Sequence, residues 1–125
     1  MLYARSCRLK DTAVRYQSLS EHSRAVSEMT KQTCAIIGME GVGILEGIVH
    51  DGGKSEPAWQ AYMMEDSHSE MVQHGLPGAS FTTELFKSRN RPEDERLKQM
   101  LALAVRGHHG GLHDVLRPDG ESCIP

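Results

Sequence analysis

The chain has 125 residues, of which 38% are hydrophobic and 25% charged, and its formal net charge is −3. This length predicts a single domain with a modest core. The slightly acidic balance excludes a protein that binds nucleic acid through uniform basic charge alone. The three cysteines have no CxxC spacing, which argues against a disulfide framework or a structural zinc site and fits a reducing cytoplasm. No apolar stretch approaches the ~18–20 residues that cross a bilayer, so we expect no membrane partner.

The first part of the chain predicts one loop and one long helix. Residues 1–17 have no clear periodicity, so we expect a loop or a weak extended segment there. The segment Ser18-Leu19-Ser20-Glu21 has the spacing of a capping box, in which Ser18 caps a helix and Glu21 lies three residues on. Apolar residues at steps of three and four then continue to Gly38, and His22 lies on their side of the helix.

Two later helices end in nearly the same way. The apolar run from Ile44 to Val49 has helical spacing and stops at His50-Asp51-Gly52-Gly53, and we expect its apolar side to be buried. The apolar run from Leu97 to Val105 stops at His108-His109-Gly110-Gly111. We expect each glycine pair to end its helix by reaching positive φ. Each helix therefore delivers two adjacent side chains that can bind metal.

The segments between these helices predict two more. Ser55 is expected to cap a short helix with Pro57 in its first turn. After a polar loop in which we expect His68 to be exposed, a helix should begin near Pro77, and a last one after Pro92. We expect Phe81, Leu85 and Phe86 to share one face of the helix near Pro77. Since no segment alternates like a strand, the expected fold is all-α, with about five helices.

The candidate ligands come from four separate places in the chain: His22, His50, Asp51, His74, His108 and His109. An acid in the last turn of a helix is disfavoured by roughly 0.3–1 kcal/mol, and a bound cation would explain it. Six donors exceed the needs of one four-coordinate zinc, whereas two divalent ions that share Asp51 would use them all. Such a pair binds a phosphodiester and activates water. Imidazole ligands without thiolates favour manganese, iron, cobalt, nickel or zinc over calcium.

Each of these residues also has an ordinary alternative. Asp51 could be a solvated turn residue, and His50 and His22 could be hydrogen-bonded core histidines. Lys54 could neutralise a phosphate oxygen or a leaving group, and it could equally be a surface lysine.

Several segments in order resemble the HD superfamily of metal-dependent phosphohydrolases, and more narrowly the HD nuclease domain of the CRISPR-associated helicase-nuclease of type I systems. They are Tyr3-Ala4-Arg5-Ser6, Leu19-Ser20-Glu21-His22, Ile48-Val49-His50-Asp51-Gly52-Gly53-Lys54, His74 with Gly78-Ala79, and His108-His109-Gly110-Gly111-Leu112. The last of these, HHGGL, is the most specific. Arg5 departs from the family, which carries histidine there, and Gly52 stands where leucine is common.

The resemblance implies an HD-type helical bundle and a metal-dependent DNA endonuclease or exonuclease in the prokaryotic cytoplasm. It would cleave single-stranded DNA in antiviral defence, fed by a helicase domain or subunit and recruited by an RNA-guided surveillance complex. It also implies one metal on His22, His50 and Asp51 and a second on His74, His108 and His109, with Asp51 shared. Asp51 and Lys54 would be the catalytic residues, and the candidate ions are manganese, nickel, cobalt, iron, magnesium and zinc.

The family's domain continues past HHGGL with further helices and a late aspartate, whereas this chain ends at Pro125. We therefore expect residues 1–125 to be one partial HD domain, whose uncovered apolar faces would favour a homo-oligomer or a domain swap. Two other functions stay open. One is an HD phosphohydrolase that acts on nucleotides, and the other is a truncated, catalytically weak HD module with a binding role.

Overall fold

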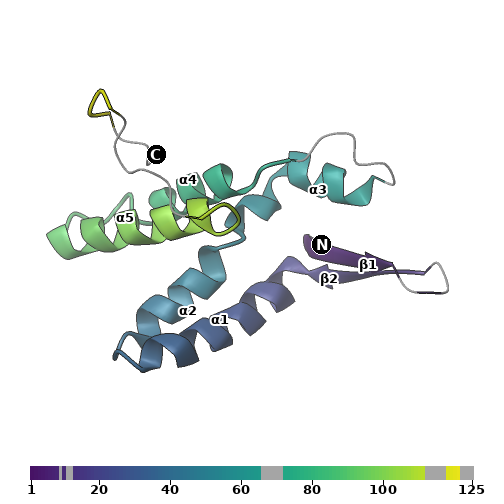
Figure 1. The fold of residues 1–125 in the computed structure, drawn as a ribbon, viewed down its shortest axis with the longest axis horizontal. Helices are drawn as coiled ribbons and strands as arrows, with labels where there is room; N and C mark the ends of the chain where they lie inside the picture. Colours follow the sequence, from purple (N-terminus) through teal and green to yellow (C-terminus); the bar gives the residue numbers. More distant parts are fainter. Residues whose placement is uncertain (9, 11–12, 66–71, 112–117, 122–125) are drawn as a thin grey trace.

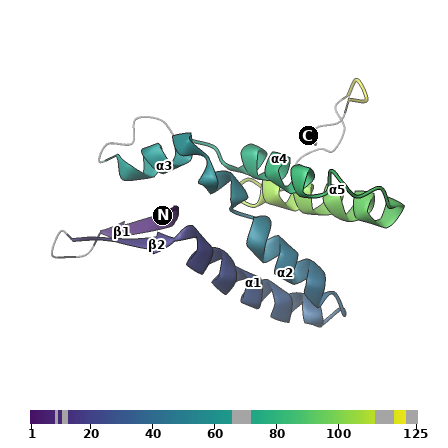
Figure 2. The ribbon, with the colours of Figure 1, turned by 180° about the vertical axis from the view of Figure 1, so that it is seen from behind.

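The computed structural model of the chain describes residues 1–8, 10, 13–65, 72–111 and 118–121. Its elements, in chain order, are β1 (Tyr3–Arg8), β2 (Val14–Ser18), α1 (Leu19–Ala35), α2 (Glu40–Val49), the 3-10 helix η1 (Gly52–Ser55), α3 (Pro57–Met64), α4 (Gly75–Leu85) and α5 (Pro92–Gly107). Helices α1 and α2 form one antiparallel pair and α4 and α5 another, with η1 between them (Figures 1 and 2). The predicted helical fold class is confirmed in its main part, and the described residues contain five α-helices where about five were expected.

The expectation that the chain contains no strand is wrong. Strands β1 and β2 pair antiparallel, with Arg5 opposite Gln17, and the pairing is irregular between Tyr3 and Arg5. Gln60 of α3 joins this hairpin to η1: its side chain bonds the backbone N–H and C=O of Tyr3 at 3.0 and 2.8 Å and the carbonyl of Lys54 at 2.7 Å. The hairpin thus lies against the segment that follows Asp51.

The capping box at the start of α1 is confirmed. The Ser18 hydroxyl accepts from the Glu21 N–H at 3.2 Å, and the Ser18 N–H donates to the Glu21 carboxylate at 3.3 Å. Two otherwise unpaired backbone donors at the helix start are satisfied in this way. Helix α1 ends before Gly38, which takes a φ of 69° in the turn to α2.

Helices α1 and α2 contact through small residues, so the expectation of a buried apolar side on α2 is largely wrong. A Cβ added at Gly47 would lie 2.2 Å from the Cα of Ser27, and the Ser27 hydroxyl donates to the carbonyl of Ile44 at 3.0 Å. The backbones are too close to leave room for large side chains. Ile44 and Ile48 are therefore 37% and 50% exposed, and only Val49 of the apolar run is fully buried.

Helices α4 and α5 pack more conventionally. Their shared core contains Ala79, Thr82, Leu101, Ala102 and Val105, all buried. Of the three residues expected to form an apolar face on α4, only Phe86, the C-cap of the helix, is buried, whereas Phe81 and Leu85 are exposed.

The two glycine pairs act differently from each other. Gly111 has a φ of 81°, as expected for a residue that ends a helix, but Gly52 and Gly53 do not have positive φ and instead continue into η1. Gly53 is required for space, because a Cβ there would lie 2.0 Å from the backbone carbonyl oxygen of His74, whereas a Cβ at Gly52 would meet only the side chain of Phe81. The expected cap of α3 is one residue early: Glu56 is the N-cap, and the Ser55 hydroxyl donates to the Gly52 carbonyl at 2.7 Å.

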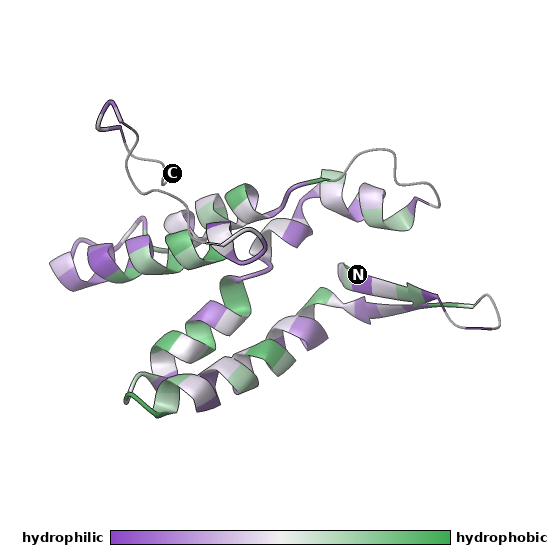
Figure 3. Cartoon of the chain, viewed as in Figure 1, coloured by the Kyte–Doolittle hydropathy of each residue, from purple (hydrophilic) through white to green (hydrophobic). Residues whose placement is uncertain are grey.

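Several large apolar side chains remain on the surface. Met29, Ile36 and Ile37 are 67%, 85% and 69% exposed, and the last two lie at the turn between α1 and α2, where the ribbon is coloured hydrophobic (Figure 3). None of the helices in the described part of the chain has both the length and the apolar character needed to cross a membrane.

Candidate metal centre

Four separate segments bring their polar side chains together at one carboxylate. His22 lies in the first turn of α1, His50 caps the end of α2, and Asp51 follows it directly before η1. His74 is the N-cap of α4, and His108 is the C-cap of α5. Because every one of these residues lies at or near a helix terminus, the packing of the two helix pairs around η1 fixes their relative positions.

Asp51 is 2% exposed, and its two oxygens face different histidines. The Oδ2 atom lies 2.9 Å from Nε2 of His22 and 3.3 Å from Nε2 of His50. The two Nε2 atoms are themselves only 3.3 Å apart. His22, His50 and one carboxylate oxygen therefore form a compact triad.

The second oxygen has its own set of histidines. Oδ1 of Asp51 lies 3.2 Å from Nε2 of His74 and 3.3 Å from Nε2 of His108. His109 joins this group through His74, since their Nε2 atoms are 3.0 Å apart. In both groups the ligand atoms all lie within 4.8 Å of one another.

The backbone orients two of the rings for metal binding. Nδ1 of His50 lies 2.9 Å from the carbonyl of Gly47, and Nδ1 of His108 bonds the carbonyl of Val105. A carbonyl only accepts, so each Nδ1 carries the proton and donates it, and in the neutral ring the lone pair is on Nε2. Histidine ligands of metals are typically held in this way by a second hydrogen bond.

The surrounding donors keep Asp51 ionised. Burial by itself raises the pKa of this carboxyl, but hydrogen bonds from His108, His50, His74 and Lys54 outweigh burial and hold the pKa well below its usual range. The carboxylate is therefore negative at any physiological pH and attracts cations into the centre.

The surroundings shift the pKa values of the histidines in different directions. Burial lowers the pKa of His22 and of His109, and it does so with the help of neighbouring positive groups and against the opposing charge of Asp51. The hydrogen bond to Asp51 raises the pKa of His108. Two of the rings thus favour the neutral form that binds metal, while His108 retains a proton more readily when no metal competes for Asp51.

Lys54 is not the exposed surface lysine that was one alternative. Its side chain is 11% exposed, and Nζ lies 2.8 Å from Oδ2 of Asp51 and 3.2 Å from the carbonyl of Ala4. The ammonium also lies 5.1 Å from the centre of the Trp59 ring. The ammonium thus occupies a position next to the Oδ2 atom of Asp51 in which a positive charge is stabilised.

Glu46 also lies near the centre, although the sequence did not predict it as a site residue. It lies on α2 one turn before His50, and its Oε2 atom is buried with no hydrogen-bond partner among the residues that the structure describes. Burial raises the pKa of this carboxyl, while the charges of His50 and His108 act in the opposite direction. The four-residue spacing from His50 is the signal that would have pointed to it.

The structure brings together all six side chains that the sequence singled out as ligands, and Lys54 with them. The alternative of a solvated Asp51 does not hold, since that carboxylate is buried. His68, expected to be exposed, lies outside the described residues. A buried cluster of four histidines around one aspartate, with His109 beside it, could bind a metal ion.

No protein-family model and no curated protein matched the sequence.

Proposed function

We propose that the chain is a divalent-metal-dependent phosphodiesterase that cleaves single-stranded DNA. One observation supports this most: a single buried carboxylate offers one oxygen to His22 and His50 and the other to His74 and His108. Two groups of ligands that share one carboxylate suit a pair of neighbouring metal ions, which is the arrangement that many phosphodiesterases use.

The donors fit divalent ions of the first transition series. His22, His50 and Asp51 would hold one ion, and His74, His108 and His109 the other, with Asp51 shared between them. Nitrogen donors without thiolates favour manganese, iron, cobalt, nickel or zinc, whereas magnesium and calcium prefer oxygen donors. When bound, such ions activate water and neutralise the charge that develops on a phosphodiester during hydrolysis.

The protein's own groups would prepare this chemistry. The carbonyls of Gly47 and Val105 fix two rings with Nε2 toward Asp51, so that ligands need little rearrangement. Lys54 balances the charge of Asp51 and would shift toward a phosphate oxygen when cations take its place.

The choice of substrate and partners rests on the resemblance of the sequence to the CRISPR-associated HD nuclease domain. The adjacent His50-Asp51 and the segment His108-His109-Gly110-Gly111-Leu112 carry that resemblance. On this proposal a helicase domain or subunit supplies the single strand, and an RNA-guided surveillance complex selects the target in a prokaryotic cytoplasm.

The test is cleavage of a labelled single-stranded DNA in a series of divalent metals. The native chain should cleave with manganese, nickel or cobalt and lose activity when EDTA is added. Asp51→Ala should abolish cleavage, while Glu93→Ala, which removes an exposed carboxylate from α5, should leave it unchanged. Cleavage that persists in Asp51→Ala would contradict the proposal, and hydrolysis of free nucleotides without DNA cleavage would favour the nucleotide-hydrolase alternative.

A further inference from the structure

A cavity of about 510 Å³ lies directly beside the candidate metal centre. His74 and His109, which belong to the second histidine group, form part of its wall. The rest of the wall comes from α3, from the residues just before α4 and from the end of α5. Anything that occupies this cavity would therefore lie next to whatever is bound by these two histidines.

One wall of the cavity is aromatic. Trp59 and Tyr62 are three residues apart on α3 and both line it. The Trp59 ring meets the His74 ring edge to face, with 5.8 Å between the ring centres. Flat rings next to a phosphate-binding site are the usual means by which proteins hold an unpaired nucleobase.

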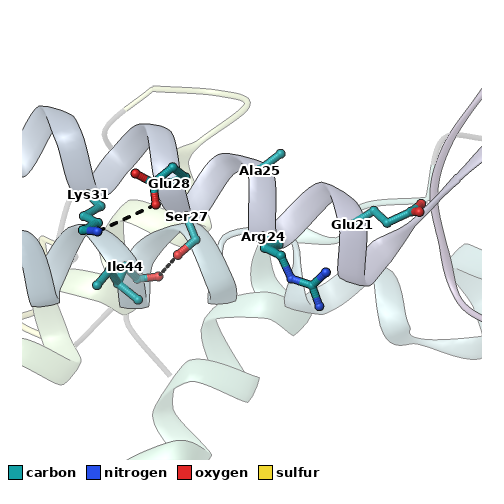
Figure 4. Close-up of a pocket in the computed structure, with 7 residues that line it drawn as sticks. All are labelled: Glu21, Arg24, Ala25, Ser27, Glu28, Lys31 and Ile44. Carbon is teal, nitrogen blue, oxygen red and sulfur yellow. Dashed lines mark hydrogen bonds and ion pairs between the residues drawn. The ribbon is translucent and has the colours of Figure 1, made fainter.

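The charge of the cavity also suits a nucleotide. Arg106 lines it from the last turn of α5, and none of the described residues in its wall is acidic. The open groove between α1 and α2 differs in this respect, because Glu21 and Glu28 lie there beside Arg24 and Lys31 (Figure 4). None of the described residues that line that groove belongs to the metal-binding cluster.

We propose that the cavity is a nucleoside subsite, which accepts the unpaired base and sugar next to the phosphate held at the metal centre. This inference rests on the proposed phosphodiesterase function. The base would stack against Tyr62, with the buried Trp59 ring behind it in the same wall, and Arg106 would bind the flanking phosphate. The volume lies in the range of small-molecule sites, so it has room for one nucleoside. A base within a duplex is paired and stacked and would have to be extruded first, which makes the site selective for single strands.

The first test uses the fluorescence of Trp59, which is the single tryptophan of the chain. We expect dTMP to change this fluorescence at saturable concentrations and deoxyribose 5-phosphate, which lacks the base, to bind at least about 5-fold more weakly. Tyr62→Leu and Arg106→Gln should each weaken dTMP binding by a similar factor, and Tyr62→Phe should restore it because the ring is kept. Arg24→Gln removes the same charge from the groove between α1 and α2, and this variant should bind dTMP as the native chain does.

The second test compares cleavage of oligothymidylate with cleavage of an oligonucleotide of equal length whose residues are all abasic. The native chain should prefer the thymidylate strand, and Tyr62→Leu should lose that preference while cleaving the abasic strand normally. Arg106→Gln should cleave both strands more slowly and keep the preference, because both strands carry the flanking phosphate. If neither strand is cleaved by the native chain, the proposed function fails, and the fluorescence titration still decides whether the subsite exists. Equal binding of dTMP and deoxyribose 5-phosphate, or variants that bind dTMP like the native chain, would overturn the subsite.

Discussion

The substitution Gly53→Ala tests whether the close contact between η1 and the start of α4 builds the second half of the centre. A Cβ at residue 53 would lie 2.0 Å from the carbonyl oxygen of His74 and 2.7 Å from the backbone nitrogen of Gly78. Both obstacles are backbone atoms, so no side chain can rotate away. Since real Cβ contacts are essentially never under 3.0 Å, the two segments must separate by at least about 1 Å.

This separation has a cost in stability and in metal binding. Forcing extra atoms into a packed site typically costs about 1–3 kcal/mol. For a chain of this size, that corresponds to a fall of about 4–12 °C in the melting temperature. The 3.2 Å contact between Nε2 of His74 and Oδ1 of Asp51 would be lost with it.

The assay is thermal unfolding followed by circular dichroism in EDTA, and then a calorimetric titration with manganese or nickel. Gly53→Ala should melt lower than the native chain and lose one binding event, while the group of His22, His50 and Asp51 keeps the other. Gly41→Ala is the matched control, because nothing lies within 4 Å of its added Cβ. That control should be neutral or more stable by up to about 1 kcal/mol, since alanine favours a helix over glycine. A Gly53→Ala variant with native melting temperature and native metal binding would show that this backbone contact does not build the second half of the centre.

Two further results are expected. Ser18→Ala removes the capping box of α1 and should lower the free energy of unfolding by about 1 kcal/mol, measured by urea denaturation; an unchanged midpoint would show that the cap contributes nothing. Metal affinity should fall as the pH drops from 7.5 to 5.5, by about tenfold for each imidazole that titrates in this window, because metal binds only the neutral ring. His22 and His109, whose pKa values are lowered, should contribute less to this loss than His108, whose pKa is raised. Calorimetric titrations at three pH values measure the slope, and a pH-independent affinity would argue against imidazole ligands.

The sequence predicted those features that depend on neighbouring residues. The capping box at Ser18 needs only the spacing to Glu21, and the histidines at the ends of α2 and α5 are marked by the glycines that follow them. Such signals are local, because the chemistry that ends a helix acts within one turn.

The features that were missed depend on distant partners. Helix α2 buries Gly47 against Ser27 and leaves Ile44 and Ile48 exposed. A pattern of apolar residues cannot predict such a contact, because it forms between the two backbones. The sequence left Lys54 open between a phosphate-binding residue and a surface lysine, and its contacts with Asp51 and with the carbonyl of Ala4 come from segments that the fold brings together. The hairpin itself carries a weak alternation in Val14–Ser18, which is too short to outweigh the absence of a pattern in the strand it pairs with.

The most direct test of the metal centre is a crystal of the chain soaked in manganese and measured for anomalous scattering. We expect two peaks, one beside each carboxylate oxygen of Asp51, the first also bound by His22 and His50 and the second by His74, His108 and His109. A single peak on one oxygen, or manganese bound only elsewhere, would contradict this expectation.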